Sequence, residues 1–167
     1  MNNIISLKEK EHEKHVRGLF WEYLEWANKR VNEEFKVNFD IETMLEEDMK
    51  NLDVFLPPNG RILLGETDNS ISGIGCLKKS KDEYGEIKRM YVLPEFRGKG
   101  LGKLILTNLV QCARDIGYKY LRLDSTKFMK EEHSLYRRMG FQDIEPYPES
   151  EIPDEFKSHW VFMQLKL

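Results

Sequence analysis

The sequence has few of the features that mark secreted, membrane-bound or metal-dependent proteins. It holds only two cysteines among 167 residues, Cys76 and Cys112, and they lack the spacing of metal ligands. No apolar run approaches the roughly 20 residues that span a membrane, and the one at the N-terminus is too short for a signal peptide. We therefore expect reduced thiols in or near the core, no metal, no membrane association and a cytoplasmic location.

The chain also lacks a strong excess of charge of either sign. Charged residues make up 33% of it, yet the net charge is −3, so nothing indicates a nucleic-acid-binding protein. Repeats, low-complexity tracts and linkers are missing, and 40% of the residues are hydrophobic. These absences favour one globular domain over residues 1–167.

Three glycines and three basic residues lie together in the middle of the chain. Residues 86–93 read as a short apolar strand that Pro94 ends, and the glycine turn that follows precedes apolar residues at helical spacing from Leu101 to Ala113. A helix that begins in such a turn presents backbone N–H groups without partners, and its dipole favours negative charge. The turn predicts a polyanion site; the alternative is that the glycines merely cap the helix. The basic side chains beside it are Arg97, Lys99 and Lys103.

The spacing Arg97-x-x-Gly100-x-Gly102 resembles the acetyl-CoA pyrophosphate loop of the GNAT family of N-acetyltransferases. It differs from the nucleoside triphosphate loop, because no Gly-Lys-Ser/Thr follows, and from the dinucleotide fingerprint, whose glycines are spaced differently. The resemblance implies that acetyl-CoA is the co-substrate and that strand backbone beside the turn binds its pantetheine arm. The implied binding residues are Met90, Tyr91, Val92, Arg97, Gly98, Lys99, Gly100, Leu101, Gly102 and Lys103.

The predicted order of elements is similar to that of the same family. A helical crossover makes one strand pair parallel, whereas hairpins make the others antiparallel. We therefore expect an α/β (α+β) fold with a mixed, mostly antiparallel sheet flanked by helices, and the resemblance implies that the parallel pair splays around the pantetheine arm. The predicted elements are a short strand at 4–7, helices at 8–31 and 40–52, strands at 61–67, 71–79 and 86–93, a helix from 101 that Gly117 ends, a strand at 120–124, a helix at 130–139, and strands at 141–144 and 160–165.

The segment from Leu135 to Phe141 resembles the Leu-Tyr-x-x-x-Gly-Phe segment of the family, whose tyrosine contacts the CoA sulfur. That residue is Tyr136 here. A phenol with a pKa near 10 stays protonated at pH 7 and can donate to a departing thiolate. The alternative is a helix residue that packs on Phe141. The asparagine that many members carry seven residues earlier is replaced by Met129.

Amine acetylation also needs a proton acceptor, because an ammonium cannot attack a thioester. A lysine-like amine is uncharged in only about one molecule in a few thousand at pH 7, a penalty of roughly 4–5 kcal/mol. Glu86 lies eleven residues before Arg97, a spacing similar to that of the general-base glutamate in histone-type members. Burial on a strand would raise its pKa. The alternatives are an ion pair with Lys88 or Arg122, or a solvated strand end.

The sequence thus predicts an N-acetyltransferase that moves the acetyl group of acetyl-CoA to a primary amine by direct attack in a ternary complex. Neither cysteine lies near the motifs, which disfavours a covalent acetyl-enzyme. Two alternatives remain, a non-catalytic acyl-CoA sensor and a structural domain. The acceptor and the quaternary state, a homodimer included, stay open. Acceptor binding is expected in the first two helices, the loop between them and residues 145–158. The aromatic side chains there and at the start of the last strand are also typical of a core; they are Trp21, Tyr23, Trp26, Phe35, Phe39, Tyr147 and Trp160.

Overall fold

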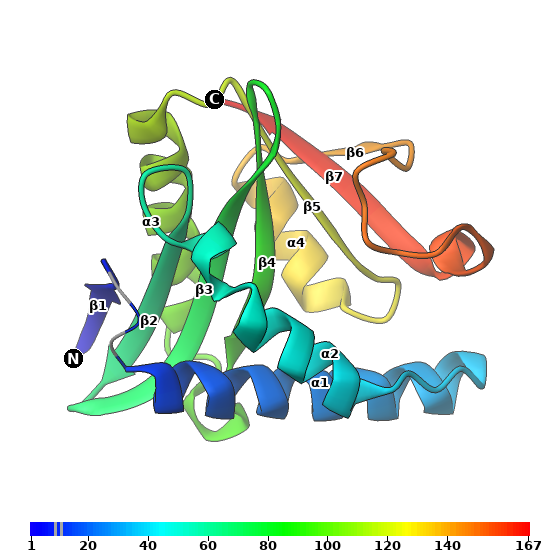
Figure 1. Cartoon of the computed structure of the whole chain (residues 1–167), viewed down its shortest axis with the longest axis horizontal. Helices are drawn as coiled ribbons and strands as arrows, with labels where there is room; N and C mark the ends of the chain where they lie inside the picture. Colours follow the sequence, from blue (N-terminus) through cyan, green and yellow to red (C-terminus); the bar gives the residue numbers. More distant parts are fainter. Residues whose placement is uncertain (9, 11) are drawn as a thin grey trace.

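The protein is seen here as a computed structural model that describes residues 1–8, 10 and 12–167. Its centre is a seven-stranded sheet in the order β1-β2-β3-β4-β5-β7-β6, with helices on both faces (Figure 1). The strands are β1 (Asn2–Ser6), β2 (Arg61–Thr67), β3 (Ser70–Lys81), β4 (Tyr84–Val92), β5 (Tyr120–Thr126), β6 (Gln142–Ile144) and β7 (Trp160–Lys166). The helices are α1 (Glu13–Phe35), α2 (Ile41–Lys50), α3 (Leu101–Ile116) and α4 (Lys130–Arg138), with 3-10 turns η1 (Leu52–Phe55), η2 (Pro94–Phe96) and η3 (Asp154–His159).

The predicted mixed sheet and its order of elements are confirmed, with shifts at several ends. The first helix begins five residues later than expected and runs on to Phe35, while the prediction for residues 9 and 11 lies outside the described residues. The second helix begins after Asp40, whose carboxylate accepts a hydrogen bond from the Thr43 amide at 3.1 Å. It ends at Lys50 instead of residue 52, because a 3-10 turn follows.

The two faces of the sheet carry separate cores. Along β2, Leu63 packs with α3, whereas Ile62 and Leu64 pack with α1 and α2 on the opposite face. This alternation follows from the two-residue period of a strand. Both faces of β2 are therefore apolar, and β4 and β5 lie between the helix pair α1 and α2 and the helix pair α3 and α4 (Figure 1).

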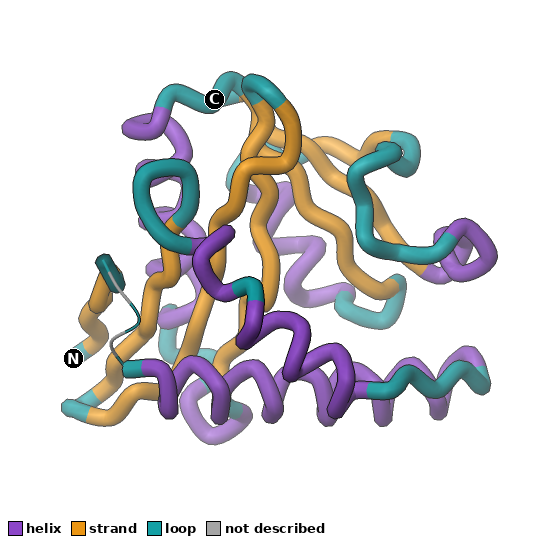
Figure 2. The backbone as a smooth tube through the Cα atoms, in the orientation of Figure 1, coloured by secondary structure: helices purple, strands orange, loops and turns teal. Residues whose placement is uncertain are grey.

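The only parallel pair in the described sheet is short. Strands β4 and β5 pair from Tyr84–Tyr120 to Glu86–Arg122. Beyond that point β4 continues with β3 alone to Val92, and β5 pairs with β7 up to Thr126. Figure 2 shows the two strands diverging from their paired ends. The splayed parallel pair implied by the resemblance is therefore present, and it leaves two open strand edges inside the molecule.

A β-bulge lies in β4 beside this gap. Ile74 of β3 pairs with Tyr91 and Cys76 pairs with Lys88, so one more residue lies on β4 than on β3 between these two pairs. Arg89 takes up the extra length at φ 52°, a conformation that is costly for a residue with a side chain. The bulge interrupts the β3–β4 ladder in the part of β4 that no longer pairs with β5.

Helix α3 packs closely on the sheet over three strand glycines, Gly65, Gly73 and Gly75. A Cβ at Gly75 would lie 2.6 Å from Ile105 Cγ2 and 2.8 Å from Leu109 Cδ1. Ile105 and Leu109 are fully buried, so they have little room to move. The position of α3, and with it the glycine turn that precedes this helix, depends on this close contact.

We predict that Gly75→Ala lowers the free energy of unfolding by about 1–3 kcal/mol, because the added methyl overpacks the contact with α3. The matched control is Gly18→Ala in α1, where an added Cβ meets nothing within 4 Å. That substitution should stabilise the protein by about 0.5–1 kcal/mol. Urea unfolding of both variants checks this, and equal stability of the two would contradict the close packing.

Candidate active site

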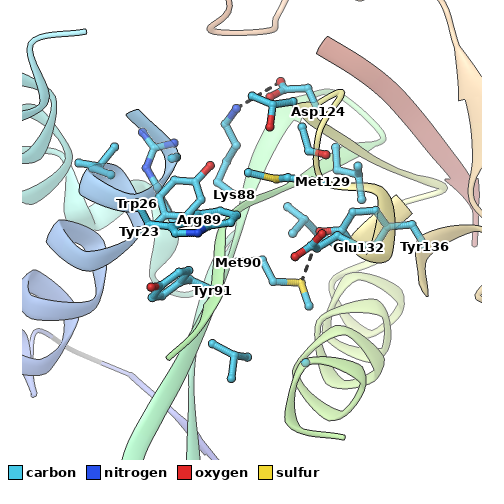
Figure 3. Close-up of a pocket in the computed structure, with 18 of the residues that line it drawn as sticks. Tyr23, Trp26, Lys88, Arg89, Met90, Tyr91, Asp124, Met129, Glu132 and Tyr136 are labelled. Atoms are coloured by element: carbon cyan, nitrogen blue, oxygen red, sulfur yellow. Dashed lines mark hydrogen bonds and ion pairs between the residues drawn. The ribbon is translucent and has the colours of Figure 1, made fainter. Parts of the chain in front are cut away.

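A cavity of about 1010 Å³ occupies the gap between β4 and β5. One side is formed by β4, β5, the start of α3 and the inner face of α4. The other is formed by α1, α2 and residues 151–153 of the segment between β6 and η3. Figure 3 shows side chains from both sides pointing into this space. The cavity brings the glycine turn, Tyr136 and the predicted acceptor elements together.

The glycine turn forms one end of the cavity. Gly98 and Gly100 adopt φ 74° and 82°, which residues with a side chain avoid. Gly100 is the N-cap of α3 and offers no side-chain cap, and the first turn of the helix carries no acidic residue. Its first N–H groups and the positive end of its dipole are therefore suited to an anion. The members of the turn that line the cavity are Arg97, Gly98, Gly100, Leu101, Gly102 and Lys103.

The predicted basic residues of the turn differ in position. Arg97 lines the cavity, but its Nε donates to the Val92 carbonyl at 2.9 Å and its guanidinium lies over the rings of Trp26 and Tyr91, at 5.1 and 5.2 Å. Lys99 is outside the lining, with its ammonium 5.3 Å from the ring centre of Phe96. Of the three basic residues of the turn, Arg97 and Lys103 thus line the cavity, and Arg97 also links the end of β4 to α1.

Tyr136 projects from α4 toward β4. Its hydroxyl donates to Met90 Sδ at 4.0 Å, a contact drawn in Figure 3, and the side chain lines the cavity. Its ring also packs against Phe141 at 5.9 Å between centroids, so the two readings of this residue are compatible. Burial raises the pKa of Tyr136 above its usual value, and the phenol therefore stays protonated. A proton donor faces a sulfur atom across the gap.

Glu86 lies on β4 at the last parallel pair and is fully buried. It does not line the cavity. Its Oε1 accepts from the Tyr147 hydroxyl at 3.0 Å and lies 3.3 Å from Lys88 Nζ. Burial raises the pKa of Glu86, and the charge of Lys88 opposes this. Of the two ion pairs considered from the sequence, that with Lys88 is present, whereas Arg122 contacts Gln164 and Glu149.

Asp124 extends this network into the cavity. Its Oδ2 lies 3.3 Å from Lys88 Nζ and accepts from Ser150 at 3.1 Å and Tyr147 at 3.4 Å. Burial alone would lower the pKa of Lys88, but the carboxylates of Asp124 and Glu86 more than offset it, so Lys88 stays charged. Asp124 lines the cavity where Glu86 does not. Sequence reasoning missed it, although a carboxylate next to the buried Leu123 of β5 was a signal.

The opposite side of the cavity is aromatic. The predicted acceptor aromatics that line it are Tyr23, Trp26, Phe39 and Trp160. Those outside its lining are Trp21, Phe35 and Tyr147. The cavity therefore extends from the gap into an aromatic pocket, the part that these four side chains line.

The cysteines take no part in the site. Cys76 is buried, Cys112 is half-buried, both are free thiols and neither lines the cavity. Burial raises the pKa of each, which disfavours the reactive thiolate. Within residues 1–8, 10 and 12–167, no group of three or more His, Cys, Asp or Glu side chains is arranged to hold a metal ion, and no helix is long and apolar enough to cross a bilayer.

A sheet that splays at its parallel pair, with an uncapped helix at one end of the gap and a phenol at its side, is the arrangement of an acyl-CoA N-acyltransferase. The model of the acetyltransferase (GNAT) family matches residues 16–141. An uncharacterized N-acetyltransferase of Schizosaccharomyces pombe, C1271.07c, is 29% identical over 81% of each chain. The uncharacterized N-acetyltransferase YjgM of Escherichia coli is 40% identical over a shorter stretch, 44% of each chain.

The solved structures agree with this fold. The PaiA N-acetyltransferase of Thermoplasma acidophilum, in complex with coenzyme A, superposes with a TM-score of 0.75 over 100% of this chain and 99% of that one, at 18% identity. The chain therefore belongs to the GNAT acetyltransferase family. Membership of this family makes it an acetyl-CoA-dependent acetyltransferase.

We predict that Gly100→Val weakens CoA binding by about tenfold, because a β-branched residue resists φ 82° and would turn the amides of the helix start away from the anion. Gly117→Val is the matched control: Gly117 ends α3 at φ 99°, with open space around a Cβ, and lies outside the cavity. Both variants should lose stability. Calorimetric titration with CoA should separate them, and unchanged affinity in Gly100→Val would move the anion elsewhere.

Proposed function

We propose that this protein transfers the acetyl group of acetyl-CoA to a primary amine by direct attack within a ternary complex. The observation that carries the proposal is one continuous cavity, which runs from the uncapped start of α3 along the open edge of β4 to the Tyr136 hydroxyl. Its two sides suit two substrates. The turn and the strand gap suit the donor, and the aromatic pocket suits the acceptor.

The donor would bind along the turn and the strand. The pyrophosphate would accept hydrogen bonds from the backbone of residues 98–103, with Lys103 and Arg97 supplying charge. The pantetheine amides would pair with backbone groups of Met90 to Val92, which have no ladder partner on the β5 side. The bound coenzyme A of the Thermoplasma relative supports a donor of this kind.

The chemistry then needs one attack and three proton transfers. The amine nitrogen attacks the thioester carbonyl carbon, and the carbon–sulfur bond breaks as the amide forms. The leaving thiolate takes the proton of Tyr136, whose hydroxyl lies beside β4, 4.0 Å from Met90 Sδ. The nitrogen starts as an ammonium and ends as an amide N–H, so it loses two protons: one as the amide forms, which restores the Tyr136 phenol, and one before the attack, which must reach a carboxylate.

We assign that proton to Glu86, with Asp124 as the group that faces the cavity. Glu86 has no exposed surface, so it takes the proton indirectly, through a water molecule or through Asp124. The Tyr147 hydroxyl lies within reach of both carboxylates, at 3.0 and 3.4 Å, and joins them. Burial raises the pKa of Glu86, which makes it a stronger proton acceptor than an exposed carboxylate.

Tyr136→Phe should lower kcat by about 10²-fold, because the thiolate would leave without a proton, while the KM for acetyl-CoA stays close to that of the wild type. Tyr118→Phe is the matched control, since Tyr118 donates to the Asn59 carbonyl outside the cavity. Thiol release in steady state measures both. A Tyr136→Phe enzyme with wild-type kcat would remove the phenol from the mechanism.

Glu86→Gln should slow the reaction most at low pH. In the wild type, kcat/KM rises as Glu86 loses its proton and levels off above its raised pKa. In the variant only the free amine reacts, so the rate keeps rising toward the pKa of the amine and the deficit shrinks as pH increases. Losing one member of a buried ion pair also costs stability, so the thermal midpoint is measured alongside. A uniform loss at every pH would reduce Glu86 to a structural partner of Lys88.

A further inference from the structure

Three cations converge on one carboxylate at the acceptor side of the cavity. Glu151 Oε1 lies 3.1 Å from Lys78 Nζ, and its Oε2 lies 3.6 Å from Lys88 Nζ and 3.5 Å from Arg89 Nη2. All four residues line the cavity. The side chains of Lys88 and Arg89 are only 5% and 9% exposed, whereas that of Glu151 is 42% exposed. A surface segment thus contributes one carboxylate to a buried cationic site.

Glu151 is not needed to neutralise these cations. Arg89 makes a two-pronged contact with Asp48, at 2.6 and 2.9 Å. Lys88 has Glu86 and Asp124, and Lys78 lies 3.9 Å from Glu86.

The three cations hold Glu151 in its charged form. Burial alone would raise its pKa, but the charges of Lys88, Arg89 and Lys78 hold it at about 2. The site thus receives a fourth carboxylate that remains ionised under all ordinary conditions.

The site lies next to the point where the acetyl group would be transferred. Lys88 and Arg89 directly precede Met90 on β4, and all three residues line the same cavity. A carboxylate bound by these cations and an amine at the thioester would therefore fit within one small molecule. The aromatic wall of Tyr23 and Trp160 borders the same space.

We propose that Lys78, Lys88 and Arg89 form a carboxylate-binding subsite, and that the acceptor is an α-amino acid with an apolar or aromatic side chain. The inference rests on the proposed function. The acceptor carboxylate takes the position of Glu151, which the chain itself supplies from the segment between β6 and η3. Its side chain enters the aromatic pocket, and its α-amine points along β4 toward the acetyl group.

The test compares two product-like compounds that differ only in the carboxylate, N-acetyl-L-phenylalanine and N-acetylphenethylamine. Each is titrated by calorimetry into CoA-saturated protein. The carboxylate compound should bind at least tenfold tighter. Glu151→Gln should tighten its binding several-fold, because the competing charge is gone, and Lys78→Gln should weaken it several-fold. Neither variant should change binding of the neutral compound.

Glu149→Gln is the matched control. Glu149 lies two residues away in the same segment and pairs with Lys81 and Arg122 outside the cavity. It should leave both affinities unchanged. Tighter or equal binding of the neutral compound, failure of both compounds to bind, or weaker carboxylate binding in Glu151→Gln would overturn the subsite. If CoA itself fails to bind, the proposed function fails, and the same titrations into the protein alone still decide the subsite by its preference for the carboxylate.

Discussion

The early end of the β4–β5 ladder is the constraint on which the rest of the structure depends. Seven residue pairs bind β5 to β7, while β4 stays with β3, so the two strands part after Glu86 and Arg122. Open backbone edges inside a protein need partners, and in the proposed complex an extended amide-bearing arm would supply them. The same parting makes room for Tyr136 from α4. The proposed donor site is therefore a consequence of sheet topology, and the glycine turn would fix only one of its ends.

Charge accumulates where the strands part. Glu86, Lys88 and Asp124 occupy positions that would be apolar in a continuous sheet, and each is less than a tenth exposed. Burying ions is costly unless they are paired, and here they are paired with one another and with Tyr147. We infer that the protein keeps these buried ions, despite their desolvation cost, because the network would hold charged groups beside the reacting atoms.

Sequence patterns predicted the elements of the fold well because each rests on local rules. Apolar periodicity located α3, and glycines marked both of its ends. The site could be predicted from the sequence only in part. The turn and Tyr136 were found from motif spacing, but spacing cannot tell which way a side chain points, so Lys99 was grouped with Arg97 although it lies outside the cavity. Asp124 and Glu151 meet Lys88 only through tertiary contacts, which no local pattern records.

The most direct test of this account is a crystal structure of the protein with CoA. We expect the pyrophosphate on the backbone amides at the start of α3, the pantetheine arm along β4 in the gap, and the sulfur within hydrogen-bonding distance of the Tyr136 hydroxyl. A sulfur atom on the far side of β4, or a pyrophosphate bound away from the glycine turn, would contradict the claim that the parted strands form the donor site.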